Sequence, residues 1–159
     1  MRISSTLRLL MVAAVAGASA FVTAPVNAGP ADTVALVGSG TISPGLTPVC
    51  CVPQTFTFNG TGAGTVNGVT GVFNCAAQGD DHEGTYSNGD GGFSGSCNAP
   101  CGTVLISGLY TRLGSVVSMT GAITGGCVPT RNFTGRCTFT PTSGPVVTSY
   151  HLSCEIAVS

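Results

Sequence analysis

The sequence contains no lysine and no tryptophan, and only 7% of its 159 residues are charged. Its strong cations are five arginines, and two of them, Arg2 and Arg8, lie close to the start of the chain. A protein with so few positive side chains cannot neutralise many phosphates. We therefore expect no nucleic-acid partner and no electrostatic attachment to an anionic membrane surface.

Helical periodicity is also missing after residue 28. No stretch of eleven residues there has apolar groups at the i, i+3, i+4 and i+7 spacing without an interrupting glycine. Threonine, valine and aromatic residues instead alternate in short runs between glycines and prolines, which is typical of an all-β domain. We predict an antiparallel β-sandwich or a meander β-barrel of about 8–10 short strands, stapled by disulfides. Of the two architectures we favour the sandwich.

The beginning of the chain has the features of an export signal. A positively charged start and the apolar run 9–16 precede a small-residue cleavage pattern at Val26–Ala28. We predict that residues 1–28 are a cleaved signal peptide and that 29–159 form one domain. The domain then has three arginines and six carboxylates, a formal charge of −3. The expected location is extracellular, with no membrane attachment after cleavage.

The clearest strand is predicted at the end of the chain, where residues 150–159 alternate with a period of two. Alternation of this kind is the mark of a sheet with one packed face and one wetted face. The apolar face carries Tyr150, Leu152, Cys154, Ile156 and Val158. A second example has Val117, Met119, Gly121 and Ile123 on one face. Further candidate strands are 33–42, 55–60, 64–66, 69–75, 84–87, 93–97, 103–113 and 133–140.

Four turns are predicted between these strands. Asn67-Gly68 suits the two positive φ angles of a type I′ hairpin. Asn88-Gly89 is a second hairpin candidate, between Thr85-Tyr86 and the next strand. Leu113-Gly114 and Ser143–Pro145 are expected to reverse the chain before the last strands.

Eight cysteines follow residue 49, and an exported chain is expected to use them as cross-links rather than metal ligands. Eight cysteines allow 105 pairings, so the connectivity does not follow from the count. A bond between the adjacent Cys50 and Cys51 would strain the chain, so we expect these two to hold different partners. The predicted disulfide cysteines are Cys50, Cys51, Cys75, Cys97, Cys101, Cys127, Cys137 and Cys154.

Two pairings of Cys137 remain open. A chain reversal near Pro145 brings Cys137 opposite Cys154, whereas a bond to Cys127 closes a short local loop. Each link is worth roughly 3 kcal/mol in the chain-entropy model. Because glycine contributes no side chain to a core, we expect a sparse core that needs these links.

Acidic residues gather at one place, in Asp80, Asp81, His82 and Glu83, with Asp90 just beyond. Several carboxylates at close spacing are a candidate calcium site. The alternative, which we favour, is a solvated hairpin loop whose residue types suit turns. No other cofactor is expected.

No catalytic residue is predicted. His82 and His151 are the two imidazoles, and the sequence has no Gly-x-Ser-x-Gly elbow. Glu155 shares the polar face of the last strand with His151 but lies roughly 13 Å along it, too far for a dyad. Tyr86, Phe93 and Tyr110 offer either a binding surface or core packing, and we favour packing.

Three segments, GTISPGL at 40–46, CVPQT at 51–55 and FTPTS at 139–143, resemble small secreted actinobacterial proteins of unknown function. The resemblance implies export and a bacterial source, and it assigns no site. We therefore expect a secreted, non-catalytic binding or surface module for a small molecule, a glycan or a protein. The alternative is a hydrolase or metal-dependent enzyme that uses the loop around His82.

Overall fold

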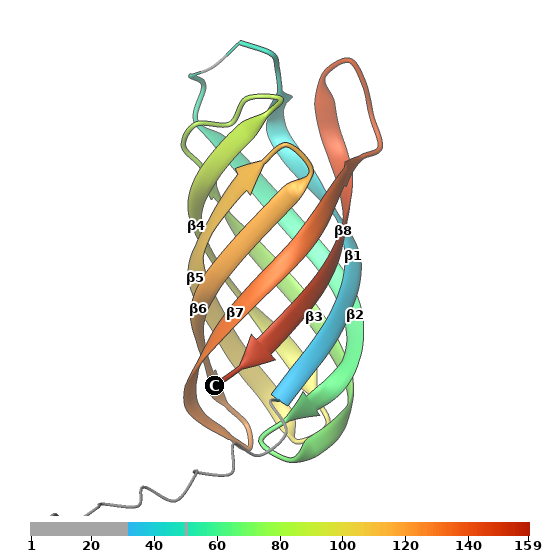
Figure 1. The fold of residues 1–159 in the computed structure, drawn as a ribbon, viewed down its shortest axis with the longest axis vertical. Coiled ribbons are helices and arrows are strands. Elements are labelled where there is room, and N and C mark those ends of the chain that lie inside the picture. The colour runs from blue at the N-terminus through green and yellow to red at the C-terminus, as the bar shows by residue number, and fades with distance from the viewer. Residues whose placement is uncertain (1–31, 50) are drawn as a thin grey trace, which may run out of the picture.

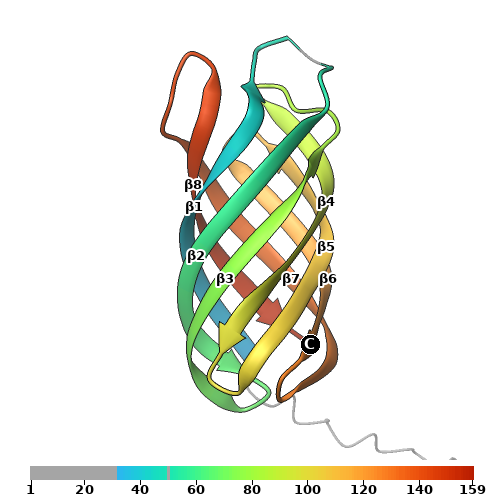
Figure 2. The ribbon, with the colours of Figure 1, turned by 180° about the vertical axis from the view of Figure 1, so that it is seen from behind.

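The computed structural model describes residues 32–49 and 51–159, which form a closed barrel of eight antiparallel strands (Figures 1 and 2). Each strand pairs with the next one in sequence, and β8 returns to pair with β1. The strands are β1 (Asp32–Leu46), β2 (Gln54–Val66), β3 (Val69–Asp81), β4 (Asn88–Ala99), β5 (Gly102–Leu113), β6 (Val116–Gly125), β7 (Val128–Pro141) and β8 (Val147–Val158).

The all-β class and the meander barrel are confirmed, and our preference for a sandwich is wrong. The pairing of β1 with β8 runs from Asp32↔Val158 to Thr41↔Ser149, so the sheet closes on itself and has no free edge. Residues 1–31 lie outside the described part of the chain. The export signal and its cleavage site therefore stay predictions.

The period-two alternation holds around the whole barrel. In β8 the predicted apolar face points inward, and the predicted face of β6 with Val117 and Ile123 does so too. The core lies along the barrel axis and includes Phe58, Phe73 and Phe133. The interior of an eight-stranded barrel is just wide enough to be filled by side chains or to hold one small ligand.

Glycine has a different role from the one expected, because many glycines face inward beneath aromatic rings. At Gly108 an added Cβ would lie 2.2 Å from the Thr120 carbonyl oxygen and 3.0 Å from Cζ of Phe93. The missing side chains give the aromatic rings room inside a narrow barrel. An added Cβ would meet an inward aromatic side chain at Gly38, Gly40, Gly60, Gly79, Gly91, Gly108 and Gly121.

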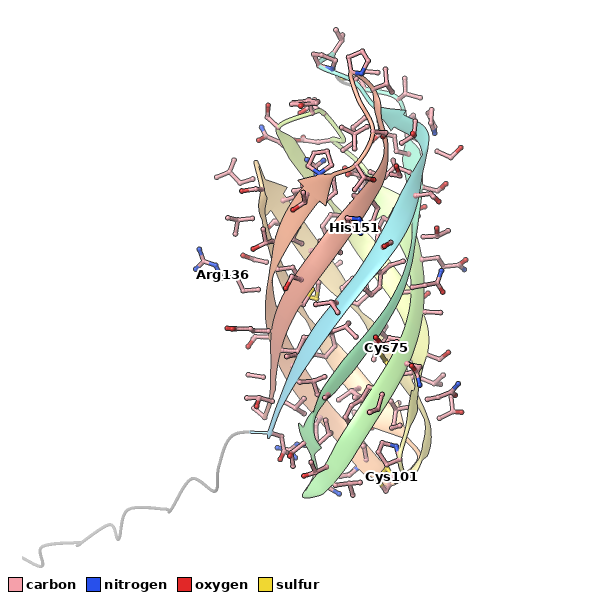
Figure 3. All side chains as sticks on the ribbon, turned by 90° about the vertical axis from the view of Figure 1, so that its right-hand side faces the viewer. Cys75, Cys101, Arg136 and His151 are labelled. Atoms are coloured by element: carbon pink, nitrogen blue, oxygen red, sulfur yellow. A yellow bond between two sulfur atoms is a disulfide. The ribbon has the colours of Figure 1, made fainter. Side chains whose placement is uncertain are left out.

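The outer surface is covered largely by hydroxyl and other polar side chains, several of them paired across strands. Thr41 lies opposite Thr57, with 2.9 Å between their hydroxyl oxygens, and Thr65 lies 2.8 Å from Thr70 in the same way. Figure 3 shows Arg136 extending away from the barrel wall. Such cross-strand pairs explain the threonine-rich composition, since each stabilises the ladder from its wet side.

Three of the four predicted turns are confirmed. Asn67 and Gly68 have φ angles of 52° and 75° and form the hairpin between β2 and β3. Gly114 has a φ of 59° between β5 and β6, and residues 142–146 connect β7 to β8. Asn88-Gly89, however, begins β4 instead of forming a turn, and the predicted strand 84–87 belongs to the connecting loop.

Three disulfides link neighbouring parts of the barrel. Cys75–Cys97 joins β3 to β4, Cys137–Cys154 joins β7 to β8, and in both pairs the residues are direct register partners. The third bond, Cys101–Cys127, joins two hairpins. The pairing of Cys137 with Cys154 is confirmed, and the rival bond from Cys137 to Cys127 is wrong.

The prediction that Cys50 and Cys51 hold different partners involves Cys50, which lies outside the described residues. Cys51 itself is disulfide-bonded. The other six cysteines are paired among themselves.

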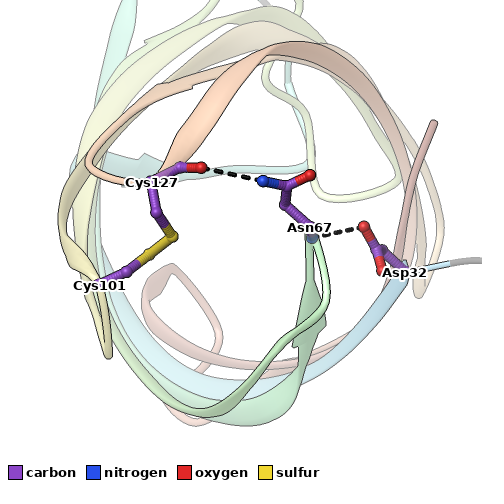
Figure 4. Close-up of a disulfide and its surroundings, with 4 residues drawn as sticks. All are labelled: Asp32, Asn67, Cys101 and Cys127. Carbon is purple, nitrogen blue, oxygen red and sulfur yellow. Dashed lines mark hydrogen bonds between the residues drawn. A yellow bond between two sulfur atoms is a disulfide. The ribbon is translucent and has the colours of Figure 1, made fainter.

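Hairpins β2–β3, β4–β5 and β6–β7 lie at the lower end of the barrel in Figure 1. A disulfide and hydrogen bonds close this end (Figure 4). The Asn67 side chain donates a hydrogen bond to the Cys127 carbonyl at 3.0 Å, and the Asn67 amide donates to Asp32 at 2.5 Å. Asp32 also forms an ion pair with Arg131 at 2.7 Å. Val66 and Val104 fill the space beneath and are fully buried. A covalent bond and a hydrogen-bond network therefore close this end.

Candidate ligand-binding site

A cavity of about 130 Å³ lies on the barrel axis. Its walls are mostly apolar and include Phe56, Phe93, Ile106, Met119 and Leu152. These five point inward yet are only partly buried. An engineered protein cavity of about 150 Å³ with a similar lining stays dry and binds benzene. The interior therefore has the size and chemistry to hold one small apolar molecule.

The polar groups inside the barrel are concentrated at its upper end, opposite the closed hairpins. Gln54, Asp81 and Arg112 are the buried polar or charged residues of the described chain, each at most 4% exposed. Gln54 and Asp81 are register partners in β2 and β3, and Arg112 comes from the end of β5. Asp81 and Arg112 are also the charged residues that line the cavity.

Arg112 holds the loop between β3 and β4 over this end. This loop, residues 82–87, is called the upper loop below. Its guanidinium lies 3.3 Å from Asp81 Oδ2 and donates to the carbonyls of Thr85 at 3.1 Å and Asn88 at 2.9 Å. A hydrogen bond from the Tyr86 amide to the Thr47 carbonyl joins the loop to the segment after β1. Arg112 holds this loop through hydrogen bonds, whereas the lower end is linked by the Cys101–Cys127 disulfide.

Aromatic rings surround the ion pair. Phe56 meets Tyr110 edge to face at 5.3 Å between centroids, and Phe139 stacks on Tyr150 at 5.1 Å. The Arg112 guanidinium lies 5.1 Å from the centroid of the Phe139 ring. The polar end of the cavity is therefore a site lined by aromatic side chains.

Burial raises the pKa of Asp81 above its ordinary value of 3.8, and the nearby Arg112 charge opposes this shift without cancelling it. Hydrogen bonds to the carboxyl from the Tyr110 hydroxyl and the Asp90 amide also lower this pKa, while Oδ1 itself has no partner within hydrogen-bond geometry among the described residues. Gln54 Oε1 is likewise without a partner in the described part of the chain. Burial also raises the pKa of Tyr110 and of Tyr150, so both hydroxyls stay protonated at neutral pH.

The structure separates the predicted calcium ligands. Asp81 points into the barrel, while Asp80 and Glu83 are exposed. His82 pairs with Asp90 at 3.8 Å on the surface. Across residues 32–49 and 51–159, no three histidine, cysteine or carboxylate side chains gather in a way that could hold a metal ion. The calcium prediction therefore gains no supporting geometry.

The predicted aromatic group is also divided. Phe93 and Tyr110 point into the barrel, whereas Tyr86 lies in the upper loop and is 51% exposed. Core packing, the interpretation we favoured, describes the first two residues only.

A pair that the sequence did not suggest lies on the outer wall, where Ser39 Oγ is 2.8 Å from His151 Nδ1 (His151 is labelled in Figure 3). The two residues are 112 positions apart in the chain and are register partners only because β8 closes onto β1. Both are exposed, and no carboxylate is paired with His151 among the described residues. The pair therefore lacks the third group that orients a catalytic base.

Sequence reasoning also missed Gln54 and Arg112. Inward positions of β5 read Val104, Ile106, Gly108, Tyr110 and Arg112, so an arginine ends an otherwise apolar face. This arginine at an inward position could have indicated a buried polar site. Gln54 carried none, because a glutamine before two phenylalanines is an ordinary way to begin a strand.

No protein-family model, no curated protein and no solved structure matches this chain. The resemblance to secreted actinobacterial proteins therefore stays a prediction. The described residues contain no helix that is long and apolar enough to span a membrane.

Proposed function

We propose that this protein is a secreted, non-catalytic binding protein that holds one small, largely apolar molecule inside its barrel. The observation that carries the proposal is the axial cavity of about 130 Å³ with its apolar walls. The three disulfides are compatible with an extracellular protein. They also stabilise the barrel, so that its interior need not be packed completely.

The asymmetry between the two ends supports this proposal. The lower end is closed by a disulfide, whereas the upper end is closed by a loop held mainly through Arg112. A ligand reaches the interior most easily past this loop, because the contacts between the loop and Arg112 are not covalent. The alternative, a hydrolase or metal-dependent enzyme at the Asp80–Glu83 loop, has no comparable geometry in its favour.

Benzene is a suitable first probe, because it has the size of the cavity and no polar group. We expect saturable shifts in the NMR signals of inward-facing methyl groups, with a dissociation constant on the order of 1 mM. That affinity corresponds to about 4 kcal/mol, well within the limit of about 1.5 kcal/mol per non-hydrogen atom for very small ligands.

Two matched variants locate the binding. Ala77→Leu adds volume inside the cavity, and Ala76→Leu makes the same change at the exposed neighbouring position of β3. Ala77→Leu should weaken benzene binding at least tenfold, while Ala76→Leu should leave it unchanged. If the wild-type protein shows no saturable binding up to the solubility limit of benzene, the proposed function is wrong.

A further inference from the structure

An apolar stripe runs along the outside of the barrel on β5 and β6. Leu105, Leu109 and Leu113 point outward from β5 and are 57%, 67% and 74% exposed. Val116, the register partner of Leu113, extends the stripe onto β6 and is exposed as well. These four residues are called the leucine stripe below. Single exposed apolar side chains are ordinary, but several in a row on a wall otherwise covered by hydroxyls mark an interaction surface.

The neighbours of the leucine stripe are small, so its side chains stand above the surface around them. Leu109 lies between Gly92 of β4 and Thr120 of β6 in the register of the sheet. A Cβ added at Gly92 would have no neighbour closer than 3.8 Å, so this side of Leu109 is open. The outward residues of β6 beside the stripe are Ser118, Thr120 and Ala122. A ridge of leucines therefore lies next to a lower row of small side chains.

Two opposite charges flank the leucine stripe at equal distances. Asp90, Thr111, Ser118 and Arg136 are register partners in turn across β4, β5, β6 and β7. Asp90 and Arg136 are therefore three strand spacings apart, roughly 14 Å, which is too far for them to pair with each other. The boundary between β5 and β6 lies midway between these two charges.

Both charged groups are accessible from outside. The Asp90 side chain is 51% exposed and has only the exposed His82 near it, at 3.8 Å. Arg136 extends away from the barrel wall (Figure 3), although Glu155 is its register partner on β8. Across residues 32–49 and 51–159, Arg136 forms no ion pair. Each charge can therefore meet a group on another molecule.

We propose that the leucine stripe is the contact surface of a homodimer, in which a second copy of this chain covers it. A twofold axis along the boundary between β5 and β6 brings Asp90 of each copy opposite Arg136 of the other. The same axis lays Leu109 of each copy over the small β6 side chains of the other, beside the other copy's Leu109. One symmetry operation thus pairs the charges and buries the leucines.

Charge complementarity is what selects a second copy as the occupant. The surface carries one acid and one base at equivalent positions on either side of the axis, so it is complementary to itself. Two barrels with outward-curved walls touch along a narrow band, which corresponds to an interface at the low end of the usual range, below about 1,200 Å² in total. We therefore expect a weak dimer with a dissociation constant on the order of 100 µM.

Sedimentation equilibrium of the disulfide-intact protein from about 10 µM to about 1 mM tests the dimer. We expect a reversible equilibrium between monomer and dimer. Leu109→Asp places a charge in the stripe and should weaken association at least tenfold. Val37→Asp is the matched control, because Val37 is 56% exposed on the outer face of β1, far around the barrel from the stripe. The control should associate as the wild type does.

Charge reversal tests the orientation of the two copies. Asp90→Arg and Arg136→Asp should each weaken association at least tenfold, because like charges then meet. The double variant Asp90→Arg/Arg136→Asp has the net charge of the wild type and restores opposite charges, so it should associate within about twofold of the wild type.

A wild-type protein that stays monomeric throughout this concentration range overturns the proposal and leaves the leucine stripe to a different occupant. Equal association of Leu109→Asp and Val37→Asp overturns it too, as does a double charge variant no better than the single ones. Binding of benzene in the axial cavity is measured separately, so these outcomes and those of the proposed function are distinguishable.

Discussion

The Arg112→Met substitution tests how the upper end of the barrel is held. It removes the ion pair with Asp81 and the bonds from the guanidinium to the carbonyls of Thr85 and Asn88. Because Asp81 then remains buried without its charged partner, the expected loss is about 3–5 kcal/mol. That is a large part of the roughly 5–15 kcal/mol that stabilises a typical domain.

The loss should depend on pH in a definite direction. The folded-state pKa of Asp81 lies above 3.8, so its contribution to stability is complete below that pH and declines as the pH rises through the folded-state pKa. Without the Arg112 charge this pKa rises further, and each additional unit adds about 1.4 kcal/mol to the decline. Arg112→Met should therefore lose more stability than the wild type between about pH 4 and pH 7.

Guanidinium chloride denaturation of the disulfide-intact protein at both pH values measures the effect. The double variant Asp81→Asn/Arg112→Met should recover most of the loss at neutral pH and lose the extra pH dependence. A cost below about 1 kcal/mol for Arg112→Met, or a cost that is the same at both pH values, would refute the reasoning.

Three further predictions concern packing and closure, each measured by denaturation. Gly108→Ala should cost about 1–3 kcal/mol, since the added Cβ would lie 2.2 Å from a backbone oxygen, while Gly92→Ala, with no contact closer than 3.8 Å, should be nearly neutral. Asn67→Ala should cost about 1–2 kcal/mol and Asn67→Gly less, because glycine accepts the positive φ. Replacing Cys101 and Cys127 by serine should cost about 3.5 kcal/mol for a 26-residue separation. These expectations are contradicted if Gly108→Ala and Gly92→Ala change stability equally. They are also contradicted if Asn67→Ala leaves stability unchanged, or if loss of the disulfide does.

Local patterns predicted the features that depend on one or two strands. Alternation over residues 150–159 gave the inward face of β8, and the chain reversal expected near Pro145 placed Cys137 opposite Cys154 as one of two open pairings. Asn67-Gly68 gave its hairpin because the turn type requires two positive φ angles, which few residue pairs accept.

Features that depend on the whole sheet could not be predicted from local sequence patterns. Closure pairs β1 with β8 across more than a hundred residues, and no local signal distinguishes a closed meander from two packed sheets. Residues 84–87 were misassigned because Thr85 and Tyr86 favour strands, while a distant arginine holds them in a loop. The upper polar site is assembled from three strands in the same way, so its parts look ordinary in the sequence.

The different closures at the two ends also bear on how the molecule moves. Opening the lower end requires breaking the bond between Cys101 and Cys127 or unravelling the hairpins that carry them, whereas the loop above Arg112 needs only to exchange its hydrogen bonds with water. Amide protons near the upper loop should therefore exchange through small local openings, and those near the lower hairpins only through global unfolding. The upper loop then opens while the rest of the sheet stays folded, which would let the proposed ligand exchange without unfolding of the barrel.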